Sequence, residues 1–275
     1  MRTTADTRAA AVAGLFYPGD ADVLARDVQA LLAAVVDAKS PASTPKALIV
    51  PHAGYIYSGP VAASAYARLR PLRSVIRRVV LLGPVHRYAV RGLALPGTQA
   101  FETPLGRVPI DREAINSILI RPMRQVTTSA AAHALEHSLE VQLPFLQQVL
   151  GDFKIVPLAV GDTTPEAVAD VIEALWGGPE TLIVVSSDLS HYQPYQSAQH
   201  IDQLTCAAIA RLQTLDSHEQ ACGATAVNGL LLAARHHHLR PQLLDLRNSG
   251  DTAGDRERVV GYAAFAFIKE PEHAH

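Results

Sequence analysis

The stretch LIVVSSDLSH, residues 182–191, is a run of bulky apolar residues that ends in small polar residues and a histidine. The segments LIVPHAGY (48–55) and VVLLGPVH (79–86) follow the same plan, with His52 and His86 just after the run. Short continuous Val, Ile and Leu runs are typical of strands that are buried on both faces of a parallel sheet. Ligands of open α/β sheets bind beyond the carboxyl ends of such strands. We therefore expect these histidines to gather at one site.

Helical patterns alternate with the apolar runs along the rest of the chain. Asp20 is a good N-cap for a first helix, and further helices are expected at 60–70, 111–120, 135–150, 165–176, 198–212 and 223–238. Strands are expected at 46–50, 78–82, 154–160, 181–186, 242–247 and 259–268. This alternation predicts an α/β fold with a mostly parallel, mixed sheet and helices on both faces. The last strand follows a polar loop rather than a helix, so we expect it to be antiparallel.

The 275 residues are expected to form a single domain (1–275) with a core of about 12–269 and flexible tails, because the only linker-like stretch, 38–46, is short enough to be a loop. The net charge is −2 and the basic residues are scattered, which argues against nucleic-acid binding. The sequence lacks an apolar run long enough for a membrane span, and its first residues do not resemble a signal peptide. A cytoplasmic protein with no membrane contact is expected.

His52 and His86 are the first candidates for metal ligands. Neutral imidazole is the commonest metal ligand in proteins, and two imidazoles from neighbouring loops form the core of many divalent metal sites. Either residue alone could equally be a hydrogen-bonded loop histidine. Their parallel placement after two strands favours the metal interpretation.

Asp188 and His191 are candidates for proton transfer. They lie three residues apart, so in a helical turn the carboxylate could orient the imidazole and raise its basicity. The alternative is that Asp188 caps the following helix.

Cys222 opens a small and apolar segment, 222–235, that is expected to be a buried helix. A thiol in the first turn of a helix is shifted toward the thiolate, the form that binds metal. The alternative is that Cys222 is a small buried hydrophobe, the role we assign to Cys206.

The segment HALEHSLEVQLPF, 133–145, places His133, Glu136, His137 and Glu140 at helical spacing. Such spacing can chelate a metal from one helix face, although a solvated face is the more common meaning. His137 and Glu140 are kept as pocket candidates together with Tyr57, which follows His52 closely. Pro144 is expected to bend this helix, and a metal role for the histidines at 236–238 is a remote hypothesis.

The ordered motifs GLFYPGD, PHAGYIYSG, GPVHR, ETPLGRVPID, EHSLEVQLPFL, VPLAVGD, SSDLSHY, ACG and NSGDTAGD with VVGYAA resemble the Memo family, whose bacterial members are called AmmeMemoRadiSam system protein B. The resemblance covers nearly the whole chain. It implies a fold similar to the catalytic subunit of class III extradiol dioxygenases, which use non-haem Fe(II).

The resemblance also implies a set of site residues. The two histidines and the cysteine that hold the metal in Memo proteins fall on His52, His86 and Cys222, and the pocket acid and histidine fall on Asp188 and His191. Extradiol enzymes carry a carboxylate where Cys222 stands, and this departure puts ring cleavage in doubt. A thiolate shifts the preference toward copper, zinc or a redox-tuned iron.

The resemblance implies an oxidoreductase that uses Fe(II), with copper or zinc as the other metals, and an unidentified small molecule or peptide as its substrate. Two alternatives remain: a non-catalytic module that binds a peptide or a metal in the same pocket, and a zinc-dependent hydrolase. The family name further implies pathway partners of the AMMECR and radical SAM types.

Overall fold

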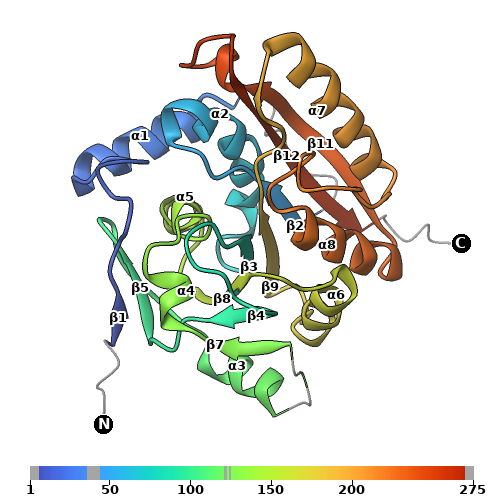
Figure 1. Cartoon of the computed structure of the whole chain (residues 1–275). Helices are drawn as coiled ribbons and strands as arrows, with labels where there is room; N and C mark the ends of the chain where they lie inside the picture. The colour runs from blue at the N-terminus through green and yellow to red at the C-terminus, as the bar shows by residue number, and fades with distance from the viewer. Residues whose placement is uncertain (1–5, 36–43, 121–122, 124, 270–275) are drawn as a thin grey trace, which may run out of the picture.

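The computed structural model describes residues 6–35, 44–120, 123 and 125–269, so most of the 38–46 loop and both tails lie outside the described residues. Its centre is a nine-stranded mixed sheet (Figure 1). The strands are β2 (Pro45–Val50), β3 (Arg78–Pro84), β4 (Leu93–Leu95), β7 (Val126–Thr128), β8 (Lys154–Val160), β9 (Thr181–Ser186), β10 (His191–Gln193), β11 (Leu239–Asn248) and β12 (Val259–Lys269). They run in the order β10-β12-β2-β9-β3-β8-β4-β7, and β11 also pairs with β12.

The four strands β2, β9, β3 and β8 are parallel neighbours, and β12 pairs antiparallel with β2 and with β11. The predicted parallel core and the antiparallel last strand are therefore confirmed. Three short strands, β1 (Thr7–Arg8), β5 (Ala100–Thr103) and β6 (Gly106–Pro109), form a separate small sheet that the sequence did not reveal.

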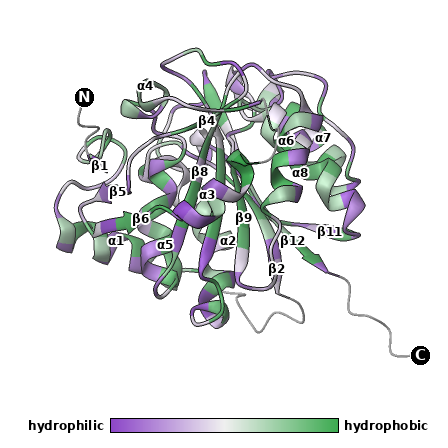
Figure 2. Cartoon of the chain, turned by 90° about the horizontal axis from the view of Figure 1, so that it is seen from below, coloured by the Kyte–Doolittle hydropathy of each residue, from purple (hydrophilic) through white to green (hydrophobic). Residues whose placement is uncertain are grey.

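Helices cover both faces of the large sheet. On one side α1 (Ala21–Ala33), α2 (Tyr55–Tyr66) and α5 (Leu143–Val149) pack together, and α6 (Pro165–Ala174), α7 (Tyr195–Ala210) and α8 (Ala224–His236) lie on the other side (Figure 1). Asp20 caps α1 by accepting hydrogen bonds from two backbone N–H groups, as predicted. In Figure 2 the strands in the middle of the sheet are mostly hydrophobic, whereas the surrounding helices mix hydrophobic and hydrophilic residues.

The segment that was predicted to be one helix over 135–150 is divided. The structure has α4 (Ala130–Ala134), a 3-10 turn at Glu140–Gln142, and α5, which begins at Leu143. Pro144 lies in the first turn of α5, where its missing N–H group costs nothing, so it starts a helix instead of bending one. The residues between α4 and α5 therefore do not continue a helix.

Glu140 fixes this segment to the N-terminal part of the chain. Its fully buried carboxylate pairs with Arg8, accepts hydrogen bonds from the N–H groups of Ala11 (2.7 Å) and Val12 (3.0 Å), and accepts one from the hydroxyl of Tyr17 (2.6 Å). The interpretation of 133–145 as a solvated face is therefore wrong. The carboxylate of Glu140 serves the fold, because its contacts hold two distant segments together.

Among the described residues, every helix is too short or too polar to cross a lipid bilayer.

We predict that Glu140→Gln destabilises the protein by about 3–5 kcal/mol, because it leaves the buried guanidinium of Arg8 without a compensating charge. Urea unfolding followed by circular dichroism measures this change. Glu102→Gln, at an exposed strand position, is the matched control and should change stability by less than about 0.5 kcal/mol. Equal stability of the two variants would contradict the structural role of Glu140.

Candidate metal centre

The carboxyl ends of the parallel strands open onto a cavity of about 670 Å³. His52, His86 and Asp188 follow β2, β3 and β9 within four residues of the strand ends, and all three line this cavity. The sheet therefore brings together side chains that are far apart in the sequence, as the repeated strand–turn–histidine pattern predicts.

His52 is buried and its ring has a defined tautomer. Its Nδ1 lies 2.9 Å from the hydroxyl oxygen of Ser186, which donates its only proton to the carbonyl of Ser138 at 2.6 Å. Nδ1 of His52 must therefore be the donor, and Nε2 carries the lone pair, 3.3 Å from Sγ of Cys222. Burial, with a smaller effect from His86, lowers the pKa of His52 to about 3. The imidazole is thus neutral and ready to bind a cation.

Glu136 orients His86 in the same way. Its carboxylate accepts hydrogen bonds from the backbone N–H of His86 (2.5 Å) and from Nδ1 of His86 (2.9 Å), which leaves Nε2 of that ring free. The same carboxylate accepts the N–H groups of His137 (2.8 Å) and Ser138 (2.9 Å). Burial acts to raise the pKa of Glu136, but the hydrogen bonds and charge of His86 outweigh it and lower the value to about 2.

His137 completes a cluster of three imidazoles. The ligand atoms of His52, His86 and His137 lie within 4.8 Å of one another, and the rings of His86 and His137 stack with centroids 4.7 Å apart. Burial, followed by the charge of His52, lowers the pKa of His137 to about 4. The cluster therefore offers imidazole nitrogens as donors to a metal, and burial keeps those of His52 and His137 neutral.

Cys222 lies beside this cluster but is not part of it. Its Sγ is 3.3 Å from Nε2 of His52, yet it does not belong to the group of atoms within 4.8 Å of one another. The residue precedes α8 and its N-cap Gly223, so the predicted place in the first helical turn is wrong. Burial and then the charge of Asp188 raise the pKa of Cys222 to about 12. The protein without metal therefore holds a thiol, which a bound cation would deprotonate.

Asp188 and His191 both line the cavity, but the structure gives them separate partners. Oδ1 of Asp188 accepts the N–H of His52 at 2.7 Å, whereas Nδ1 of His191 lies 2.8 Å from the carbonyl oxygen of Leu189. Because residues 187–190 are not helical, the expected pairing at three-residue spacing does not form. Asp188 also does not cap α7, whose N-cap is Pro194. Burial raises the pKa of Asp188.

The remaining pocket candidates divide. Tyr57 and His137 line the cavity, whereas Glu140 does not, because its carboxylate is buried among its N-terminal partners. Arg87, Arg258 and Asp255, which were not among the predicted site residues, also line the cavity. The position of Arg87 directly after His86 is the feature of the sequence that could have identified it as a cavity residue.

Comparison with known proteins agrees with this organisation. The family model described as Memo-like protein matches residues 8–266. A MEMO1 family protein from Aquifex aeolicus is 38% identical over 273 residues, which cover 95% of this chain and 99% of that protein. A MEMO1 family protein from Ignicoccus hospitalis is 38% identical, over 94% of this chain and 98% of that protein. A MEMO1 family protein from Sulfolobus acidocaldarius is 34% identical, over 94% of this chain and 99% of that protein.

A solved structure shares the fold. An uncharacterized protein from Escherichia coli K12 superposes with a TM-score of 0.53 at 15% sequence identity, over 78% of this chain and 98% of that one. This likeness supports the single-domain α/β architecture. The family model matches almost the whole chain, and the sequence relatives match it over nearly their full length. The chain therefore belongs to the Memo-like protein family.

Proposed function

We propose that this protein is a metal-dependent oxidoreductase that binds Fe(II), with copper as the second choice. The observation that carries the proposal is the convergence of three imidazoles, with ligand atoms within 4.8 Å of one another, at the carboxyl edge of the sheet, beside a cysteine thiol. In His52 and His86 the Nδ1–H group donates a hydrogen bond, so the lone pair of Nε2 is the one that can bind the metal. The donor set therefore fits a transition metal.

In this proposal His52, His86 and Cys222 hold the metal, and His137 stands as the neighbouring fourth donor. A thiolate together with imidazoles suits iron and copper better than a set of carboxylates would. When bound, such a metal supplies one-electron chemistry with O₂ or with a reducing substrate.

His191 is proposed to move protons. Its Nδ1 donates to the carbonyl of Leu189, so Nε2 is the nitrogen that can accept a proton from a substrate in the cavity. Asp188 contributes indirectly: its carboxylate holds the backbone of His52 and thereby the position of the first ligand. The wall carries charges of both signs, from Arg87 and Arg258 and from Asp188 and Asp255, which suits a polar substrate.

A second candidate function is a binding module without turnover. A groove of about 660 Å³ adjoins the metal cavity and shares Phe16, Gly54 and Tyr57 with it. Leu15 and Ile56 also line this groove, and both are largely exposed. Such an apolar surface beside a polar cavity is suited to holding a peptide.

Anaerobically prepared protein should bind one equivalent of Fe(II) at this centre, and Cys222→Ser should weaken the affinity roughly tenfold or more because it removes a ligand. A thiolate-to-metal absorption band should be present with copper and absent in this variant. Cys206→Ala, which changes a thiol in the core, is the control.

The same titration with His137→Ala identifies the third ligand. Loss of affinity in His137→Ala but not in Cys222→Ser would overturn the assignment of Cys222. A wild-type protein that binds neither Fe(II) nor copper would end the proposal as a whole.

For catalysis, we predict that His191→Gln retains the metal but lowers oxygen consumption by roughly 10²–10⁴-fold, because a positioned acid or base is lost. Oxygen uptake is measured with a panel of phenols and thiols. Unchanged uptake in His191→Gln would contradict the role of His191. If the wild type is fully loaded with metal but consumes no oxygen, the result favours the binding module. If it hydrolyses a substrate with zinc, and oxygen has no effect on the rate, the result favours the hydrolase.

A further inference from the structure

A second cluster of metal-ligand side chains lies at the other edge of the sheet. Glu173 is in the last turn of α6, and His236 and His237 are at the end of α8. Because α6 leads from the end of β8 back to the start of β9, its last turn lies near the amino ends of the parallel strands, opposite the first centre. The ligand atoms of these three residues lie within 4.8 Å of one another.

The two imidazoles converge on one carboxylate. Nδ1 of His236 is 3.0 Å from one oxygen of Glu173, and Nε2 of His237 is 2.8 Å from the other. The two adjacent histidines thus present different ring nitrogens to the two oxygens of one carboxylate. Among the described residues, the ion pairs of this carboxylate are with histidines and not with Lys or Arg. A Lys or Arg partner would serve a purely structural ion pair at any pH.

The helices that carry the cluster are held firmly in place. α6 and α8 pack so closely that a Cβ atom at Gly229 would lie 2.5 Å from Cγ1 of Val168 and 3.1 Å from the carbonyl oxygen of Pro165. Their ends are therefore fixed relative to each other without a metal. Ligands on rigid elements form a preorganised site.

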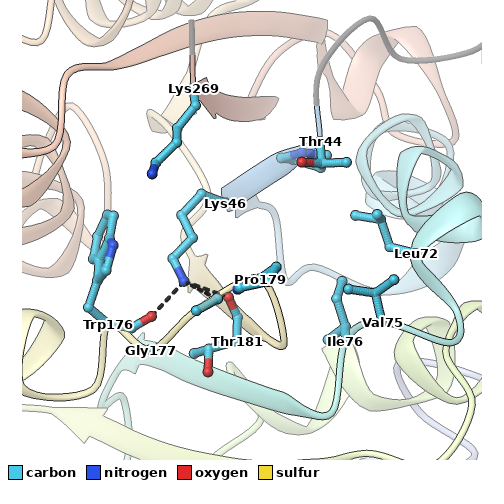
Figure 3. A pocket seen from close by; sticks show the side chains of 12 residues that line it. Thr44, Lys46, Leu72, Val75, Ile76, Trp176, Gly177, Pro179, Thr181 and Lys269 are labelled. Atoms are coloured by element: carbon cyan, nitrogen blue, oxygen red, sulfur yellow. Dashed lines mark hydrogen bonds between the residues drawn. The ribbon is translucent and has the colours of Figure 1, made fainter. Parts of the chain in front are cut away.

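The ring of His237 is also fixed, because it stacks on Trp176 with centroids 3.6 Å apart and an interplanar angle of 7°. Figure 3 shows Lys46 beside the same indole. The ammonium group of Lys46 donates to the carbonyl oxygens of Gly178 (2.9 Å) and Thr181 (2.8 Å), which anchors the loop after α6. The indole and the anchored loop together hold the imidazole plane toward Glu173.

We propose that Glu173, His236 and His237 form a second metal site, for a divalent cation of the zinc, nickel or copper class. One carboxylate and two imidazoles with an open fourth position are a ligand set that such cations accept. A tetrahedral ion with bonds of about 2.0–2.1 Å separates its ligand atoms by about 3.4 Å, which lies within the 4.8 Å that spans the ligand atoms of this group. The side chain of His236 is 72% exposed, which leaves the site open to solvent.

The chain contains a built-in reporter for this site, because Trp176 is its only tryptophan and stacks directly on a proposed ligand. We would titrate Ni²⁺ and Cu²⁺ into the His52→Ala/His86→Ala variant, in which the first centre is disabled, and follow tryptophan emission. Saturable quenching at one equivalent is expected, and Zn²⁺ should compete with it. Glu173→Gln and His236→Ala should each weaken binding roughly tenfold or more.

His238→Ala is the matched control, because His238 follows the two ligands directly but lies outside the group. Absence of saturable quenching, or equal affinity in Glu173→Gln and His238→Ala, would overturn the proposal. If the double variant does not fold, zinc content of the otherwise unchanged protein decides: Glu173→Gln/His236→Ala should bind one equivalent less than the wild type, and an equal content would refute the site. Neither outcome bears on the first centre, whose ligands are untouched in this pair.

Discussion

The buried carboxylate of Glu136 is the constraint on which the candidate metal centre depends. It accepts the backbone and ring N–H groups of His86 and the backbone N–H groups of the two residues after Glu136 itself. Removing a carboxylate from water costs free energy unless its oxygens accept hydrogen bonds. Here the N–H groups of the loop after β3 and of the turn before α5 donate those hydrogen bonds. A single charge thus fixes two candidate ligands, one through its ring and backbone and one through its backbone.

Buried carboxylates play the same part elsewhere in the turns around the cavity. Asp188 holds the backbone of His52, and Glu140 holds the N-terminal segment that brings Phe16 to the cavity wall. The strands place the site, but these acids shape the loops that follow the strands. This arrangement explains why acidic residues that look like candidate ligands in the sequence do not all face the cavity.

The sequence predicted the sheet well, because a buried parallel strand needs a continuous apolar run that is visible without any tertiary information. It predicted the positions of His52, His86 and Asp188 for the same reason. It did not predict the break between α4 and α5 or the partner of His191, because both depend on which long-range hydrogen bonds win over local helical spacing. The three-residue and two-residue strands were missed because pairing with distant segments decides them, and their own composition does not.

The sequence separation between His52 and Cys222, 170 residues, has a consequence for how the protein matures. During synthesis the chain emerges from its N-terminus, and the first strand and its histidine appear long before the segment that carries the cysteine. A cation that meets the growing chain finds isolated side chains with weak affinity. The ligands come together only when β9 and α8 have joined the sheet, in contrast to small zinc domains whose metal drives folding. For the proposed metal centre, loading would therefore be a late event that acts on a finished scaffold, and the fold would have to be stable before the metal binds.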